Sequence, residues 1–92
     1  MWGSFLWDVR KEAENVRKHG VNFETAARAF LDPRRKIYTD AEHSVREERF
    51  FCIGTVEERV LTVRFTYRED RIRIFGAGYW RKGQVYYETS ED

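Results

Sequence analysis

The chain has 92 residues, and its 17 Lys and Arg against 16 Asp and Glu give a formal net charge of +1 at pH 7. This length predicts a single domain over residues 1–92, with a small core that recruits most of the large apolar side chains. The one cysteine, Cys52, excludes an internal disulfide framework. No apolar run is long enough to span a bilayer and the start lacks the pattern of a secretion signal. We therefore expect a soluble, cytoplasmic protein without a membrane partner.

The first residues predict a short strand and then a helix. The apolar residues 5–7 end at Asp8, whose side chain can accept hydrogen bonds from the free amides of a helix over 9–19. Gly20 is suited to end that helix, because it adopts the left-handed conformation that other residues avoid. The residues that we expect to pack this helix on the core are Val9, Ala13 and Val16.

A second helix and a series of strands complete the chain. Asn22 caps the second helix, and Asp32 with Pro33 stops it. Apolar patterns predict strands over 37–39, 47–55, 61–67 and 71–75, and a C-terminal helix over 81–88. Helices followed by strands indicate an α+β fold, in which an N-terminal helical hairpin packs on one face of an antiparallel β-sheet meander. The other face of the sheet should then be open.

That open face should carry positive charge. In the strand over 61–67 the apolar side chains point to one side and Arg64 to the other, because strand side chains alternate. Glu69 and Asp70 form the turn into the next strand, which alternates in the same way. Between Arg64 and Gly83 there are six Lys or Arg against two acids, so the positive charge of this nearly neutral chain is local.

Several kinds of chemistry lack a sequence signal. His19, His43 and Cys52 are far apart and show no metal-ligand spacing, so we expect no metal and no other cofactor. Neither a GxSxG motif nor a phosphate-binding glycine loop occurs. What remains is a basic, aromatic surface. Such a surface suits RNA, because guanidinium groups pair with phosphates and aromatic rings stack on unpaired bases.

The same surface suits RNA cleavage without a metal. Attack of a ribose 2′-hydroxyl on its own phosphate needs a base, an acid and cations that stabilise the charge on the phosphate. His19 or Glu48 could act as the base, and Tyr79 or a lysine as the acid. The cations that could hold the phosphate are Arg68, Arg73, Arg81 and Lys82.

These candidates also have structural explanations. His19 lies in the last turn of its helix, where the free carbonyl groups favour a cation. Glu48 and Arg49 could form no more than a surface ion pair. An arginine such as Arg73 could pair across the strands with an acid such as Glu47 as readily as with a substrate.

Three motifs together resemble a known family, the BrnT toxins of bacterial type II toxin–antitoxin systems. The motifs are WDxxKxxxNxxKHGVxFExAxxxFxDP from Trp7 to Pro33, EERxxxIG from Glu47 to Gly54, and YRxxxIRIxxA from Tyr67 to Ala77. One position departs from the family pattern, in which an arginine often follows the last alanine. This chain has Gly78 there, within a GAGYWRKG ending that resembles a variant subgroup.

The resemblance implies a RelE-like ribonuclease fold, metal-independent cleavage of RNA that blocks translation, and neutralisation by a BrnA-like antitoxin. That antitoxin is expected to be a ribbon-helix-helix protein that forms a 2:2 heterotetramer with the toxin, which contacts operator DNA only through the antitoxin. On this interpretation the catalytic residues are Lys18, His19, Glu48, Arg49, Arg68 and Arg73, and the RNA-binding residues are Tyr67, Tyr79, Trp80, Arg81 and Lys82. The alternative is a non-catalytic module that uses the same basic face to bind RNA or a protein.

Overall fold

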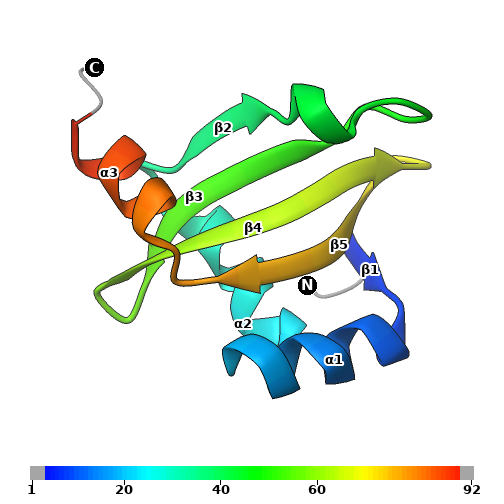
Figure 1. The fold of residues 1–92 in the computed structure, drawn as a ribbon, viewed down its shortest axis with the longest axis horizontal. Helices are drawn as coiled ribbons and strands as arrows, with labels where there is room; N and C mark the ends of the chain where they lie inside the picture. The colour runs from blue at the N-terminus through cyan, green and yellow to red at the C-terminus, as the bar shows by residue number, and fades with distance from the viewer. Residues whose placement is uncertain (1–3, 90–92) are drawn as a thin grey trace.

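The computed structural model describes residues 4–89, whose elements are shown in Figure 1. The strands are β1 (Phe5–Trp7), β2 (Lys36–Thr39), β3 (Phe50–Val56), β4 (Arg59–Arg68) and β5 (Arg71–Gly78). The helices are α1 (Val9–His19), α2 (Phe23–Arg28) and α3 (Arg81–Thr89), with short 3₁₀ turns η2 (Ala29–Leu31) and η3 (Ala41–His43). All the predicted strands and helices are present, although the strand expected over 47–55 begins at Phe50.

The predicted helix caps are confirmed. Asp8 Oδ1 accepts a hydrogen bond from the Arg10 amide at 2.7 Å, and α1 ends at Gly20, which is left-handed with φ 71°. At the start of α2, Asn22 Oδ1 accepts a hydrogen bond from the Thr25 amide at 2.7 Å. Side chains of this kind replace the partners that the first amides of a helix lack, so both helices begin where the sequence specifies.

The strands form one mixed sheet in the order β1-β5-β4-β3-β2. Strands β2 to β5 make the antiparallel meander that the sequence predicts. Strand β1, however, pairs with β5 in parallel, with Leu6 opposite Arg73, so the sheet is not wholly antiparallel. The direction of this pairing depends on how the whole intervening chain returns to β1, and no local pattern reports it.

The hydrophobic core lies between one face of the sheet and the layer of α2 and η2. Cys52, Val63 and Ala77 are in register on this face and are fully buried. Burial raises the pKa of the Cys52 thiol to about 12, so the thiol stays protonated at neutral pH. Helix α2 and η2 contribute Phe23, Ala26, Ala27 and Ala29 to the same core.

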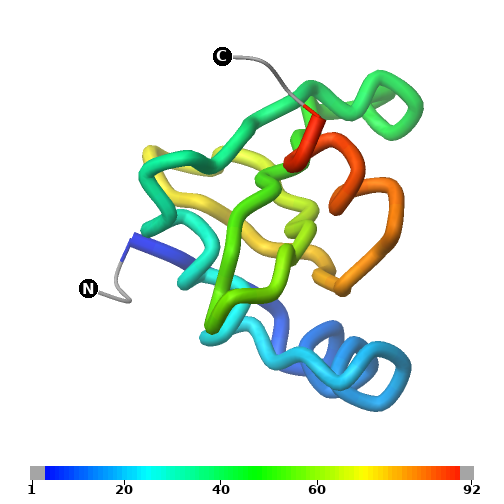
Figure 2. Tube along the Cα trace, turned by 90° about the vertical axis from the view of Figure 1, so that its left-hand side faces the viewer, coloured from blue at the N-terminus to red at the C-terminus, as the bar shows by residue number. Residues whose placement is uncertain are grey.

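The second face of the sheet is partly covered, which corrects the expectation of an open face. Helix α3 packs over β3 and β4 on the side opposite α2, while α1 runs along β5 (Figure 2). Gly83 allows the close approach of α3, because a Cβ at this position would overlap Thr62 Oγ1 on β4. Two helices therefore border the second face and leave Arg64 between them.

Helix α1 is turned differently from the prediction. Val9 and Val16 are 74% and 44% exposed, so the apolar stripe that was expected to face the core is wrong. The residue of α1 that is buried is Asn15. Its Nδ2 donates to the carbonyl oxygens of Val21 and Ala77, both at 2.9 Å, and its Oδ1 accepts from the Ala77 amide at 3.1 Å. Beyond the end of β1, Asn15 thus gives the edge of β5 the polar partners that a strand would supply.

Asp32, which follows η2, connects three parts of the fold. Its Oδ2 accepts hydrogen bonds from the Thr55 amide at 2.8 Å, from Thr55 Oγ1 at 2.9 Å and from the Tyr87 hydroxyl of α3 at 2.6 Å. Its Oδ1 accepts from the Arg34 amide at 2.9 Å. Burial by itself raises the pKa of Asp32, but these hydrogen bonds outweigh that effect and lower the pKa to about 2.

Candidate functional site

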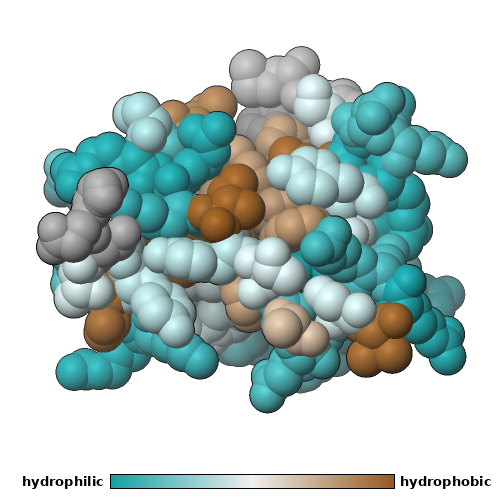
Figure 3. All heavy atoms as spheres, turned by 90° about the horizontal axis from the view of Figure 1, so that it is seen from above, coloured by the Kyte–Doolittle hydropathy of each residue, from teal (hydrophilic) through white to brown (hydrophobic). Residues whose placement is uncertain are grey.

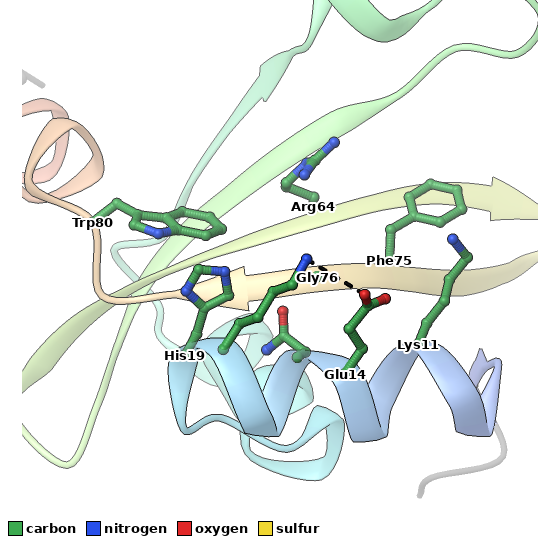
Figure 4. Close-up of a pocket in the computed structure, with 9 residues that line it drawn as sticks. Lys11, Glu14, His19, Arg64, Phe75, Gly76 and Trp80 are labelled. Atoms are coloured by element: carbon green, nitrogen blue, oxygen red, sulfur yellow. Dashed lines mark ion pairs between the residues drawn. The ribbon is translucent and has the colours of Figure 1, made fainter.

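A groove of about 170 Å³ opens between α1 and the second face of the sheet. Figure 4 shows side chains of α1 pointing toward the sheet, with Arg64 and Phe75 on the opposite side. The residues that line the groove are Lys11, Glu14, Asn15, Lys18, His19, Arg64, Phe75, Gly76 and Trp80. Lys11, Asn15 and Lys18 are neighbours on successive turns of α1, because their spacing follows the helical repeat.

The groove is positively charged. Its lining contains the cations Lys11, Lys18 and Arg64 and one carboxylate, that of Glu14. Lys18 Nζ lies 3.4 Å from Glu14 Oε2, and this exposed ion pair contributes roughly 0–1 kcal/mol. Lys11 and Arg64 form no ion pair with any residue in 4–89. An anion that enters the groove therefore meets two cations without a competing partner.

Trp80 closes one end of the groove, and a glycine determines its place. The indole lies against Gly78, where a Cβ would come within 2.5 Å of the ring. His19 meets the indole edge-on, with the ring centroids 5.3 Å apart and the planes at 86°. Since a side chain at position 78 would displace the indole, the glycine that departs from the motif has a structural role here.

A β-bulge aims an aromatic ring at the groove. Arg64 pairs with Gly76, but the next residue, Phe65, pairs with Ile74, so Phe75 has no partner on β4. The extra residue places both Phe75 and Gly76 on the second face, where they line the groove. Strict alternation along β5 would have put Gly76 on the core face, so the sequence pattern misses this arrangement.

Two of the predicted catalytic arginines, Arg49 and Arg68, lie in a second hollow of about 530 Å³. Glu47 pairs with both of them, at 3.5 Å from Arg49 and 3.2 Å from Arg68. The Arg49 guanidinium also lies 4.1 Å from the centre of the Phe75 ring. Arg49 therefore connects this hollow with the groove. The other residues that line the hollow are Glu42, His43, Val45 and Arg46.

Two other predicted catalytic residues, Arg73 and Glu48, line neither the groove nor the second hollow. Arg73 is half-buried beside β1. The backbone hydrogen bond from Arg10 lowers the pKa of Asp8, and the charge of Arg73 adds to this effect, so Arg73 lies near the start of α1. The Glu48 side chain is exposed, and its backbone oxygen accepts a hydrogen bond from Thr66 Oγ1 at 2.5 Å.

The predicted RNA-binding residues are spread over both faces. Tyr67 is 54% exposed at the rim of the core face, where it packs on aromatic rings. Tyr79 packs against the core, with the Arg59 guanidinium 3.7 Å from its ring centre. Arg81 is exposed at the start of α3, and Lys82 lines a third hollow next to Trp80.

The groove thus brings together three of the predicted residues, Lys18, His19 and Trp80. Sequence reasoning left Lys11 and Arg64 out of the predicted site. The position of Lys11 two helical turns before Lys18 was a signal available in the sequence. The outward direction of Arg64 was predicted, but its position opposite α1 depends on how that helix packs.

One group of side chains could hold a metal ion. Within residues 4–89, Asp40, Glu42 and His43 place one ligand atom each within 4.8 Å of one another. His43 Nδ1 lies 2.9 Å from Asp40 Oδ2, a hydrogen bond that holds the imidazole against a buried carboxylate. The sequence search for ligand spacing did not find this group, because it considered histidine and cysteine pairs without the neighbouring acids.

The fold and the groove define a small α+β protein that offers an anion a cationic groove with a histidine at one end. The family model described as "Ribonuclease toxin, BrnT, of type II toxin-antitoxin system" matches residues 7–83. The chain therefore belongs to the BrnT family of ribonuclease toxins, which confirms the resemblance. A comparison with curated proteins gives no match. In the described part of the chain, no helix has the length and apolar character needed to cross a membrane.

Proposed function

We propose that this protein is a metal-independent endoribonuclease that cuts RNA in the groove between α1 and β5 and so blocks translation. The proposal is carried by the meeting of Lys18 and His19 on α1 with Arg64 on β4, in a member of a ribonuclease toxin family. Lys18 and Arg64, with Lys11 beside them, bind the scissile phosphate. Their positive charge stabilises the negative charge that develops on the phosphate oxygens during attack.

His19 transfers the proton in this mechanism. Its imidazole takes the proton of the ribose 2′-hydroxyl, and the 2′-oxygen attacks the phosphorus. The bond from phosphorus to the 5′-oxygen breaks, and the leaving oxygen receives a proton from the Lys18 ammonium. The products are a 2′,3′-cyclic phosphate and a 5′-hydroxyl end. The edge-on contact with Trp80 limits rotation of the imidazole.

The other predicted site residues extend the binding surface. Arg49 stacks on Phe75 and leads from the groove to Arg68. Arg73 lies on β5 two residues before Phe75, where it contacts the phosphates of the flanking RNA, and Glu48 lies in the loop just before Arg49. Phosphate contacts of this kind position a strand without reading its sequence.

Neutralisation by a BrnA-like ribbon-helix-helix antitoxin, in a 2:2 heterotetramer that reaches operator DNA through the antitoxin, is part of the proposal. A type II toxin family implies an antitoxin partner. On the described chain, the outer edge of β2 is unpaired, and Leu31 and Ile37 are 68% and 44% exposed. Figure 3 shows hydrophobic side chains exposed between hydrophilic flanks. Exposed apolar side chains and free strand edges are typical of protein-binding surfaces.

Purified protein, free of antitoxin, tests the activity on a labelled RNA oligonucleotide in EDTA. We expect fragments that end in a 2′,3′-cyclic phosphate. His19→Asn should slow cleavage by about 100-fold or more, the usual effect of losing a proton-transfer group, while RNA binding persists. Arg64→Ala should weaken binding, whereas Arg10→Ala, an exposed arginine outside the groove, serves as the matched control.

Binding of RNA without cleavage under these conditions would reject the catalytic proposal in favour of a non-catalytic binding module. An equal loss in Arg10→Ala and Arg64→Ala would reject the groove as the site. In cells, expression of the chain without antitoxin should arrest growth, and His19→Asn should relieve the arrest at the same protein level.

A further inference from the structure

A third hollow, of about 670 Å³, lies on the second face and shares Trp80 with the groove. We call it the aromatic hollow. Its lining residues are Tyr38, Thr39, Asp40, Ala41, Glu42, Phe51, Ile53, Thr62, Trp80, Lys82, Gly83 and Tyr86. Four of these are aromatic, and the rings of Tyr38 and Tyr86 lie 5.3 Å apart with their planes at 39°. Strand β2 and helix α3 thus hold two tyrosines at one wall of the hollow.

The aromatic hollow adjoins the groove at one shared side chain, Trp80. Trp80 lines both, and it is held in place by Gly78 beneath the indole and by His19 at its edge. An RNA strand fits this arrangement. One of its phosphates can lie at Lys18 and Arg64 while a neighbouring base lies beyond the indole of Trp80. Aromatic rings bind unpaired bases by stacking, which contributes about 1–3 kcal/mol per base.

The lining of the aromatic hollow also contains polar residues, and these favour one kind of base. The Asp40 carboxylate is 5% exposed and is engaged by His43 at 2.9 Å. Glu42, in contrast, is exposed and forms no ion pair within residues 4–89. A free carboxylate accepts a pair of hydrogen bonds from two adjacent donors. Guanine is the RNA base that presents such a pair, at N1 and N2, and Lys82, which also lines the hollow, can donate to its O6.

We propose that the aromatic hollow binds an unpaired guanine of the RNA whose phosphate lies in the groove, and that it makes cleavage selective for this base. Tyr38, Tyr86 and Trp80 form the stacking surface, and Glu42 reads the N1 and N2 donors. The inference rests on the proposed ribonuclease function for the identity of the ligand as RNA. It adds a substrate preference that the phosphate contacts do not provide.

Titration calorimetry with 3′-GMP and 3′-IMP in EDTA tests the proposal, because the inosine nucleotide lacks only the 2-amino group. The protein should bind 3′-GMP about tenfold tighter than 3′-IMP, the effect of one lost hydrogen bond to a charged acceptor. In Glu42→Gln this ratio should fall to about one, whereas Glu24→Gln, an exposed glutamate on α2, should keep it. Guanosine-to-inosine exchange in the RNA oligonucleotide should slow cleavage by a similar factor.

A second pair of variants separates stacking from a general loss of structure. Ile37 and Tyr38 are neighbours on β2 with similar exposure, 44% and 37%, and their side chains point to opposite faces of the sheet. Tyr38→Ala should weaken both nucleotides about tenfold or more, while Ile37→Ala should leave their affinities unchanged. Thermal unfolding of the two variants provides the check on folding.

Equal affinities for the two nucleotides, or an equal effect of Ile37→Ala and Tyr38→Ala, would overturn the proposal. Cleavage of RNA without preference for guanine would reject this inference and leave the proposed ribonuclease standing. Selective binding of 3′-GMP without RNA cleavage would support the guanine site and reject the proposed ribonuclease activity. If Tyr38→Ala spares nucleotide binding and abolishes neutralisation by the antitoxin, the aromatic hollow is a protein-binding surface and the proposal is wrong.

Discussion

Asp32 links three segments of the protein through one carboxylate, and its ionisation connects their stability to pH. Its carboxylate accepts hydrogen bonds from Thr55, Arg34 and Tyr87, and so joins η2 to β3 and α3. Hydrogen bonds to a charged acceptor contribute about 1.5–3 kcal/mol. The same bonds favour the ionised carboxylate, and they lower the pKa of Asp32 from 3.8 to about 2.

Asp32→Asn should therefore reduce the free energy of unfolding by about 2 kcal/mol at neutral pH, because an amide cannot accept all these bonds. The folded-state pKa lies below the ordinary value, so the contribution of the carboxylate is complete above pH 3.8 and is lost as the pH falls toward 2. Urea unfolding at a series of pH values measures the free energy of unfolding of the unchanged protein and of Asp32→Asn. The difference in the free energy of unfolding between the two proteins should narrow as the pH falls from 3.8 toward 2. A constant difference would contradict the role assigned to the Asp32 carboxylate.

At the scale of the elements, the turns of the two hairpins are strained. Glu57 and Glu58 join β3 to β4 with φ of 53° and 69°, and Glu69 and Asp70 join β4 to β5 with φ of 53° and 67°. Two positive φ values define the type I′ turn, which favours Asn-Gly. A glutamate in this region costs roughly 1 kcal/mol, because its Cβ crowds the backbone.

Glu58→Gly should raise the free energy of unfolding by about 0.5–1 kcal/mol, a partial gain because glycine also loses more chain entropy on folding. Glu58 makes no ion pair within the described residues, so the substitution removes none. The midpoint of thermal unfolding should rise by roughly 3–6 °C. Glu58→Ala removes the same charge but keeps the crowding, and a similar rise in that variant would assign the effect to charge instead.

The elements also show which features of the sequence were informative. Asp8, Gly20 and Asn22 act on adjacent backbone groups, so the bounds of α1 and the start of α2 could be predicted. The buried face of α1 could not. That face is held by Asn15, which forms hydrogen bonds with the backbone of Ala77, 62 residues later in the chain. The spacing of apolar residues cannot predict such a polar contact.

At the scale of the whole molecule, the site depends on packing that connects distant segments. The α+β class and the meander followed from the order of the elements. The position of α3 on the second face depends on the fit of Gly83 against Thr62. The alternation of side chains predicted that the arginines share one face of the sheet. It could not predict which hollow each arginine lines. The bulge at Phe75 and the packing of α1 make that division, leaving Arg64 in the groove and Arg68 in the second hollow.

The rate at which a reagent modifies the buried Cys52 thiol reports how often the folded protein opens globally. The sulfur lies in the centre of β3 at 0% exposure, and with a pKa of about 12 its reactive thiolate is scarce. A disulfide reagent such as DTNB should therefore modify native protein only as fast as the sheet separates from α2, and urea should accelerate the reaction in step with unfolding. Rapid modification of native protein without urea would mean that solvent reaches Cys52 on β3 more readily than its burial indicates.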